Sequence, residues 1–145
     1  MTTEIEIILI EDSPFDAEMT IRALKTNNVS NFVTHLKDGA EALDFMFGTG
    51  PYENRDLSKK PKVILLDLKM PKVNGIEVLR KLKSDPSTKN IPVVVLTSSK
   101  EDPDVKACYE LGVNSYIVKP VGFENFTKCI SELGLYWLLL NEPLK

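Results

Sequence analysis

Short, almost continuous runs of apolar, strand-forming residues recur along this chain, separated by stretches with helical spacing. Continuous apolar runs, unlike alternating ones, are typical of strands buried on both faces of a parallel sheet. Helices that connect such strands by right-handed crossovers cover both faces. The pattern therefore predicts a doubly wound α/β domain with a five-stranded parallel sheet and five helices. The expected strands are residues 4–10, 31–36, 63–66, 92–96 and 115–118.

Capping and stop residues bound the expected helices. Ser13 followed by Pro14 is a typical cap and first-turn pair. Behind them, Phe15, Met19 and Ala23 recur at the spacing of one helix face. The other helices are expected after Asp38-Gly39, after Asn74-Gly75, over about 102–111 up to a stop at Gly112, and over about 123–139.

Length and composition indicate a single domain over residues 1–145. Hydrophobic residues make up 43% and charged residues 27% of the chain, which is ordinary for a folded domain of this size. Residues 48–61 are rich in glycine, proline and charge and predict an extended surface loop. Residues 123–145 predict an extended last helix and tail, and no output domain is expected after them.

Charge and cysteine usage argue against several function classes. The net charge of −3, from 21 acidic and 18 basic residues, predicts no binding to nucleic acid or to an anionic membrane. Cys108 and Cys129 form no CxxC pair and His35 has no ligand cluster around it, so neither a disulfide scaffold nor a zinc site is indicated. A signal peptide and a membrane-spanning run are not expected either. We therefore expect a cytoplasmic protein.

Polar side chains stand where the predicted strands end. They are Glu11 and Asp12 after the first strand, Asp67 after the third, Thr97 after the fourth and Lys119 after the fifth. Taken singly, each is most simply a turn former, a helix cap or an ordinary strand residue. The carboxyl ends of parallel strands meet at one edge of the sheet, where doubly wound domains bind ligands, so the joint pattern indicates a site. Three close carboxylates repel one another unless a cation lies between them, and Mg²⁺ prefers such oxygens.

Four motifs contain these residues: IEDS at 10–13, LLDLKMPKVNG at 65–75, VLTSS at 95–99 and SYIVKP at 115–120. In this order they resemble the receiver (response-regulator) domains of two-component signalling, over nearly the whole chain. The resemblance implies a flavodoxin-like sheet of strand order 2-1-3-4-5. It also implies a signalling switch rather than an enzyme. Such a switch accepts a phosphoryl group from a sensor histidine kinase and acts through protein–protein contacts.

The resemblance implies a role for each polar residue at the strand ends. Asp67 would accept the phosphoryl group. Asp12, Asp67 and the backbone carbonyl of Lys69 would bind Mg²⁺, and Glu11 would help to hold the metal through water. Lys119 would pair with the phosphoryl oxygens, so that cations surround the transferred group, as phosphoryl transfer requires.

A conformational switch is implied by two further matches. Thr97 resembles the hydroxyl that turns inward to hydrogen-bond the new phosphoryl group, and Tyr116 resembles the aromatic residue that follows it. Their movement would bias a surface formed by the fourth helix, the fifth strand and the fifth helix. Pro120 resembles the proline whose preceding peptide bond is cis.

The loop at 48–61 and the tail YWLLLNEP resemble the small stand-alone regulators that partner the phytochrome kinases of cyanobacteria and related bacteria. A phytochrome-type kinase is therefore the expected partner. Aromatic residues at helical spacing are typical of a core, and the set here is Tyr109, Phe123, Phe126, Tyr136 and Trp137. Residues 135–140, however, are apolar almost all round the helix. This surplus predicts a homodimer through the face of the fourth helix, fifth strand and fifth helix, together with the tail.

Two other functions use similar residues. A phosphatase of the haloacid dehalogenase kind also has a strand-end aspartate and Mg²⁺, but it usually has a second acid two residues later, where this chain has Lys69. An interaction module with a degenerate site is disfavoured because every required residue type is present. A DNA-binding role lacks a helix-turn-helix segment or basic stripe.

Overall fold

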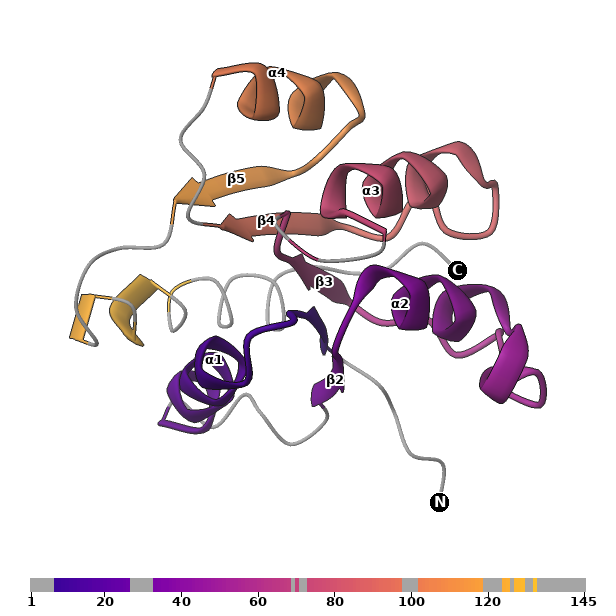
Figure 1. Cartoon of the computed structure of the whole chain (residues 1–145), viewed down its shortest axis with the longest axis horizontal. Coiled ribbons are helices and arrows are strands. Elements are labelled where there is room, and N and C mark those ends of the chain that lie inside the picture. The colour runs from indigo at the N-terminus through magenta and orange to yellow at the C-terminus, as the bar shows by residue number, and fades with distance from the viewer. Residues whose placement is uncertain are drawn as a thin grey trace.

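The chain forms a five-stranded parallel sheet with helices on both faces (Figure 1). The computed structural model describes residues 7–26, 33–68, 70, 73–97, 102–118, 124–125, 127–129 and 132. The strand order is β2-β1-β3-β4-β5 and every pairing is parallel, which confirms the predicted architecture. The strands are β1 (Ile7–Ile10), β2 (Val33–Leu36), β3 (Val63–Leu66), β4 (Val93–Thr97) and β5 (Ser115–Val118).

The strand register brings the carboxyl ends of the central strands to one level. Ile10 at the end of β1 is paired with Leu36 of β2 on one side and with Leu66 of β3 on the other. Leu66 is in turn paired with Val95 of β4. Residues that directly follow β1 and β3 therefore leave the sheet side by side, because adjacent parallel strands lie only about 4.8 Å apart.

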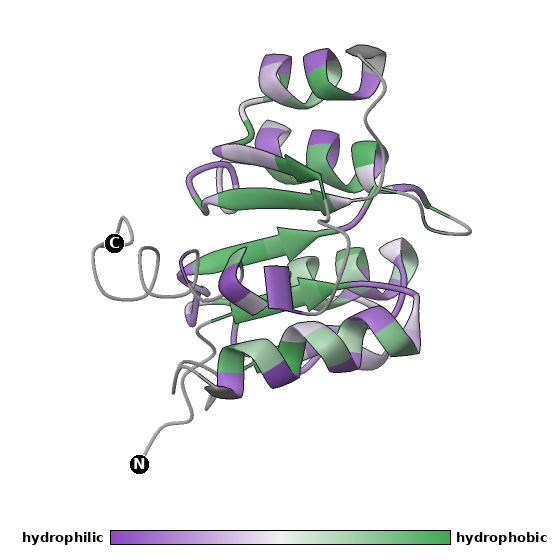
Figure 2. Ribbon diagram, turned by 90° about the vertical axis from the view of Figure 1, so that its left-hand side faces the viewer, coloured by the Kyte–Doolittle hydropathy of each residue, from purple (hydrophilic) through white to green (hydrophobic). Residues whose placement is uncertain are grey.

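In the continuously described part of the chain, four helices cover the sheet: α1 (Pro14–Thr26), α2 (Gly39–Phe47), α3 (Gly75–Ser84) and α4 (Asp102–Glu110). Alternate strand residues point to opposite faces and build two apolar clusters. One cluster joins Ile8, Ile64 and Val93 to residues of α2, α3 and α4, and the other joins Leu9 and Leu65 to α1. Figure 2 shows the strands as the most hydrophobic part of the ribbon, consistent with burial on both faces.

Local sequence signals start three of the helices. The hydroxyl of Ser13 accepts a hydrogen bond from the backbone N–H of Asp16 (3.2 Å), as expected of a cap. The carboxylate of Asp38 accepts a hydrogen bond from the backbone N–H of Glu41 (2.8 Å). The side-chain oxygen of Asn74 accepts one from the backbone N–H of Glu77 (3.0 Å). After α4, Gly112 has φ of 94°, the left-handed conformation that glycine adopts most readily.

Two aromatic residues at helical spacing are exposed. The predicted first helix is confirmed by α1, in which Ala23 is fully buried and Phe15 is 73% exposed. Tyr109 of α4 is 53% exposed, and its interpretation as core is wrong.

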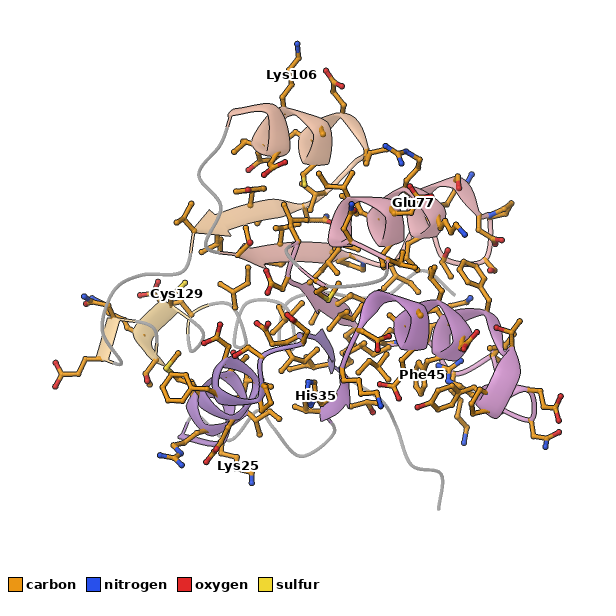
Figure 3. All side chains as sticks on the ribbon, viewed as in Figure 1. Lys25, His35, Phe45, Glu77, Lys106 and Cys129 are labelled. Atoms are coloured by element: carbon orange, nitrogen blue, oxygen red, sulfur yellow. The ribbon has the colours of Figure 1, made fainter. Side chains whose placement is uncertain are left out.

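Residues 48–61 are more ordered than the predicted extended loop. They contain a short 3₁₀-helix, η1 (Gly50–Tyr52), whose Tyr52 ring packs edge to face on Phe45 of α2 with centroids 5.1 Å apart. The guanidinium of Arg55 lies 4.0 Å from the centroid of the Phe45 ring, and Figure 3 labels Phe45. The Tyr52 hydroxyl donates a hydrogen bond to Glu41 (3.1 Å). The segment therefore folds back onto α2 through aromatic and cation–π contacts.

The predicted fifth helix is described in part. Residues 124–125, 127–129 and 132 are helical, within the range expected from the sequence. Phe123, Phe126, Tyr136, Trp137 and the tail lie outside the described residues. Among the residues that the structure describes, no helix combines the length and the apolar character needed to cross a membrane.

Candidate metal centre at the carboxyl edge of the sheet

Three acidic residues meet at the carboxyl ends of β1 and β3. Carboxylate oxygens of Glu11, Asp12 and Asp67 all lie within 4.8 Å of one another. Glu11 is only 2% exposed and Asp67 8%, while Asp12 is half-buried. The predicted convergence of acids from separate strand ends is thus present in the structure.

Backbone hydrogen bonds between neighbouring strands hold the acids in place. The N–H of Glu11 donates to the carbonyl of Leu36 at the end of β2 (3.0 Å). The N–H of Asp67 donates to the carbonyl of Ile10 at the end of β1 (3.0 Å). The backbone N–H groups of Glu11 and Asp67 therefore continue the hydrogen bonding of the sheet by one residue beyond β1 and β3.

Two glycines allow the loop after Asp67 to pack closely. A Cβ on Gly75 would overlap the backbone carbonyl oxygen of Asp67, and a Cβ on Gly39 would overlap the carbonyl oxygen of Val73. The N–H of Gly75 also donates to the carbonyl of Leu68 (2.9 Å). Gly75 at the start of α3 therefore packs against the backbone at the end of β3, and Gly39 at the start of α2 packs against Val73. The sequence analysis did not find this close packing, although Asp38-Gly39 and Asn74-Gly75 mark both places.

The donor set fits a hard divalent cation. All three side chains supply oxygen, and Mg²⁺ binds oxygen ligands at about 2.0–2.1 Å, which places two ligand oxygens roughly 3 to 4 Å apart. Without a cation, three carboxylates at this separation repel one another in a partly dry environment. The cluster is therefore suited to a bound cation.

The two residues expected to form the switch lie on β4 and β5. Thr97 is the last residue of β4, rather than the first residue after it, and is fully buried. Because Leu66 is paired with Val95, Thr97 and Asp67 leave adjacent strands within one residue of the same level. Tyr116 of β5 is half-buried against the cluster that contains α3 and α4. Lys69, Lys119 and Pro120 lie outside the described residues.

The fold and the cluster together define a class of protein, and comparison with known families agrees. The chain belongs to the response regulator receiver domain family, whose model matches residues 7–131. Members of this family accept phosphoryl groups in two-component signalling and bind a divalent metal at the site. The chain is thus a phosphoryl-accepting signalling switch by family.

The relatives narrow the class further. The chain is 42% identical to the response regulator Rcp1 of Synechocystis over 132 residues, which are 91% of this chain and 88% of Rcp1. The phosphorylated cyanobacterial phytochrome response regulator RcpA matches with a TM-score of 0.89 and 35% identity, over 98% of this chain and 99% of that one. The bacteriophytochrome response regulator AtBRR matches with a TM-score of 0.75 and 49% identity, over 97% of this chain and all of that one (100%).

Proposed function

We propose that Asp67 is the phosphoacceptor of this receiver. The observation that carries the proposal is the placement of its carboxylate. It lies at the end of a buried strand, within 4.8 Å of two other acids. In the transfer, an oxygen of Asp67 attacks the phosphorus of a kinase phosphohistidine, a P–O bond forms and the P–N bond to the imidazole breaks. The product is an acyl phosphate on Asp67 and a histidine free of phosphate.

Glu11, Asp12 and Asp67, with the backbone carbonyl of Lys69, are proposed to hold the metal, and Mg²⁺ is the ion that their oxygens suit. A structure titled the Mn²⁺-bound form of Rcp1, 38% identical to this chain with a TM-score of 0.87, supports a divalent cation at such a site. A bound divalent cation supplies positive charge opposite the phosphoryl oxygens. Lys119 is proposed to supply a second positive charge by pairing with the phosphoryl oxygens.

Thr97 and Tyr116 are proposed as the switch residues. Thr97 is buried at the end of β4, the strand next to β3, and this position supports its proposed role as the hydroxyl that hydrogen-bonds a new phosphoryl group. Phosphorylation adds close to two negative charges at this edge of the sheet. Movement of Thr97 would change the packing of Tyr116 on the adjacent β5, and so the surface that α4 and β5 share.

The proposed partner is a sensor histidine kinase of the phytochrome type. Support comes from RcpA and AtBRR, which are phytochrome and bacteriophytochrome response regulators and match nearly the whole chain. We further propose that residues 1–145 act in the cytoplasm as one receiver domain that signals by protein contacts. A homodimer through α4, β5, the fifth helix and the tail fits the exposure of Tyr109.

Phosphorylation with a small donor tests the assignment. Incubation with acetyl phosphate and Mg²⁺ should add the mass of one phosphoryl group, and Asp67→Asn should abolish the addition. Asp56→Asn is a matched control, because Asp56 is exposed and precedes β3 rather than following it. Equal uptake by Asp67→Asn and the wild type would refute the assignment. Sustained turnover of a general phosphatase substrate would instead favour the haloacid dehalogenase interpretation.

Light scattering before and after phosphorylation tests the dimer, and transfer from a panel of the host's histidine kinases tests the partner. A protein that stays monomeric in both states would remove the homodimer from the proposal. Faster transfer from kinases without a phytochrome module than from those with one would remove the phytochrome assignment.

A further inference from the structure

His35 reaches from β2 to the backbone that links the first two acids. Its Nε2 lies 2.8 Å from the backbone carbonyl oxygen of Glu11. A carbonyl oxygen can only accept a hydrogen bond, so the ring must donate from Nε2. Figure 3 shows His35 at β2, the edge strand next to β1. The contact joins residues 24 positions apart in the chain.

The carbonyl that His35 contacts belongs to the peptide between Glu11 and Asp12. β1 ends at Ile10, and the Glu11 residue is almost fully buried. Its carbonyl is therefore beyond the sheet ladder while still shielded from water, where a donor has to be supplied by the protein. A donor on this oxygen limits rotation of the peptide plane that also carries the N–H of Asp12.

The N–H of Glu11 is held from β2 as well, by the carbonyl of Leu36 at 3.0 Å. Two consecutive residues of β2 thus hold Glu11, one through the backbone and the other, His35, through its side chain. The peptide on each side of Glu11 is then tied to β2, which restricts the direction in which Asp12 leaves the sheet.

We infer that His35 is a positioning residue for the divalent cation. Its Nε2–H orients the Glu11–Asp12 peptide, and through it the carboxylates of both residues toward the shared site. The inference rests on the proposed function, because it takes the acid cluster to be the metal site. His35 acts through the ligand residues and does not itself touch the cation, in the manner of outer-shell partners that orient metal ligands.

The surroundings of His35 make substitution informative. The residue is exposed and lines an open groove together with Pro14, Ala17 and Ile21 of α1. Replacing an exposed side chain leaves no closed cavity in the core, so the fold should tolerate the change. A loss of metal affinity can then be separated from a loss of stability.

A pair of amide variants tests the inference. In His35→Gln the side-chain nitrogen can reach the position of Nε2, whereas in His35→Asn the chain is too short by one carbon. We expect Mn²⁺ affinity, measured by electron paramagnetic resonance on the whole protein, to stay within about twofold of wild type for His35→Gln. It should fall about three- to tenfold for His35→Asn. The melting temperatures of the metal-free variants should agree, which a general structural defect would not allow.

A second readout does not depend on metal. In metal-free protein, the amide NMR resonance of Asp12 should move in His35→Asn and stay near its wild-type position in His35→Gln. Equal Mn²⁺ affinity in both variants, whether retained or lost, would overturn the role of the Nε2 donor. Failure of the wild type to bind Mn²⁺ would overturn the metal site itself, and with it this inference, so the two failures are distinguishable.

Discussion

The two edges of the sheet hold different arrangements of charged groups. At the carboxyl edge, Glu11, Asp12 and Asp67 bring like charges within 4.8 Å of one another. At the opposite edge, charges are matched with polar groups of the chain itself. The ammonium of Lys83 donates to the carbonyls of Lys89 (3.2 Å) and Ile91 (2.9 Å) in the turn before β4.

An acid at this opposite edge, Asp85, is also held by hydrogen bonds from a nearby residue. The carboxylate of Asp85, next to that turn, accepts hydrogen bonds from the hydroxyl (2.6 Å) and the N–H (2.8 Å) of Ser87. These bonds hold the pKa of Asp85 below its usual value. At one edge, a single acid and a single lysine are held by nearby groups of the chain. At the other edge, three carboxylates gather at a distance that suits an external cation.

The largest expected effect comes from a methyl group added at the functional edge. Gly75→Ala would place a Cβ against the backbone of Asp67 and Leu68, so we expect the free energy of unfolding to fall by about 3 kcal/mol. Phosphoryl uptake from acetyl phosphate should fall as well, because the loop after Asp67 must move. Urea denaturation and mass spectrometry measure the two effects.

Gly112→Ala is the matched change at the other edge. Its Cβ has room, with Lys83 Cδ 3.9 Å away, but φ of 94° disfavours alanine. We expect a loss of about 1–2 kcal/mol with no change in phosphoryl uptake. If Gly112→Ala impaired uptake as much as Gly75→Ala, the two edges would not be functionally separate.

Asp67→Asn should stabilise the metal-free protein. The amide removes one of three mutually repelling charges with almost no change of shape, so we expect a gain of about 1–2 kcal/mol in the free energy of unfolding. Mg²⁺ should then stabilise the wild type more than the variant, because the variant has lost a ligand charge. Asp85→Asn, at the other edge, should bring no such gain. A metal-free Asp67→Asn protein less stable than wild type would contradict the proposed repulsion.

The smallest effect is expected from Lys83→Met. Methionine keeps most of the hydrocarbon stem but removes the donor to the carbonyls of Lys89 and Ile91, which should cost about 1 kcal/mol. Burial lowers the pKa of Lys83, so relief of its desolvation offsets part of this cost. Lys81→Met, at an exposed position of the same helix, is the control in urea denaturation and should be close to neutral. An equal response of the two variants would show that the contacts of Lys83 contribute nothing.

Much of the fold followed from local patterns. The run at 63–66 coincides with β3, because a short continuous apolar run of β-branched and leucine residues suits a strand covered on both faces. Ser13, Asp38 and Asn74 mark the starts of helices because their side chains compete for backbone donors nearby in the chain. The gathering of the strand-end acids was also predicted, because the carboxyl ends of neighbouring parallel strands lie at the same edge of the sheet.

Other features escaped the sequence analysis because they depend on contacts between distant residues. In the sequence, Arg55 is one of several charged residues in a polar loop. Only the structure shows that its guanidinium lies over the ring of Phe45. Phe15 has the helical spacing of the buried Ala23, yet it is 73% exposed. His35 offered no ligand cluster, and its contact with Glu11 arises only when β2 pairs with β1.

Residue spacing by itself thus determined the order of strands and helices along the chain and predicted which acids gather at the carboxyl edge, because periodicity and strand ends are local properties of the chain. Only the tertiary structure decided how closely the acids approach, which glycines confine the loop after Asp67, and which side chain from β2 holds the backbone between Glu11 and Asp12. These three features depend on how segments far apart in the chain pack together. The pattern of residues along the chain does not show which distant segments come into contact.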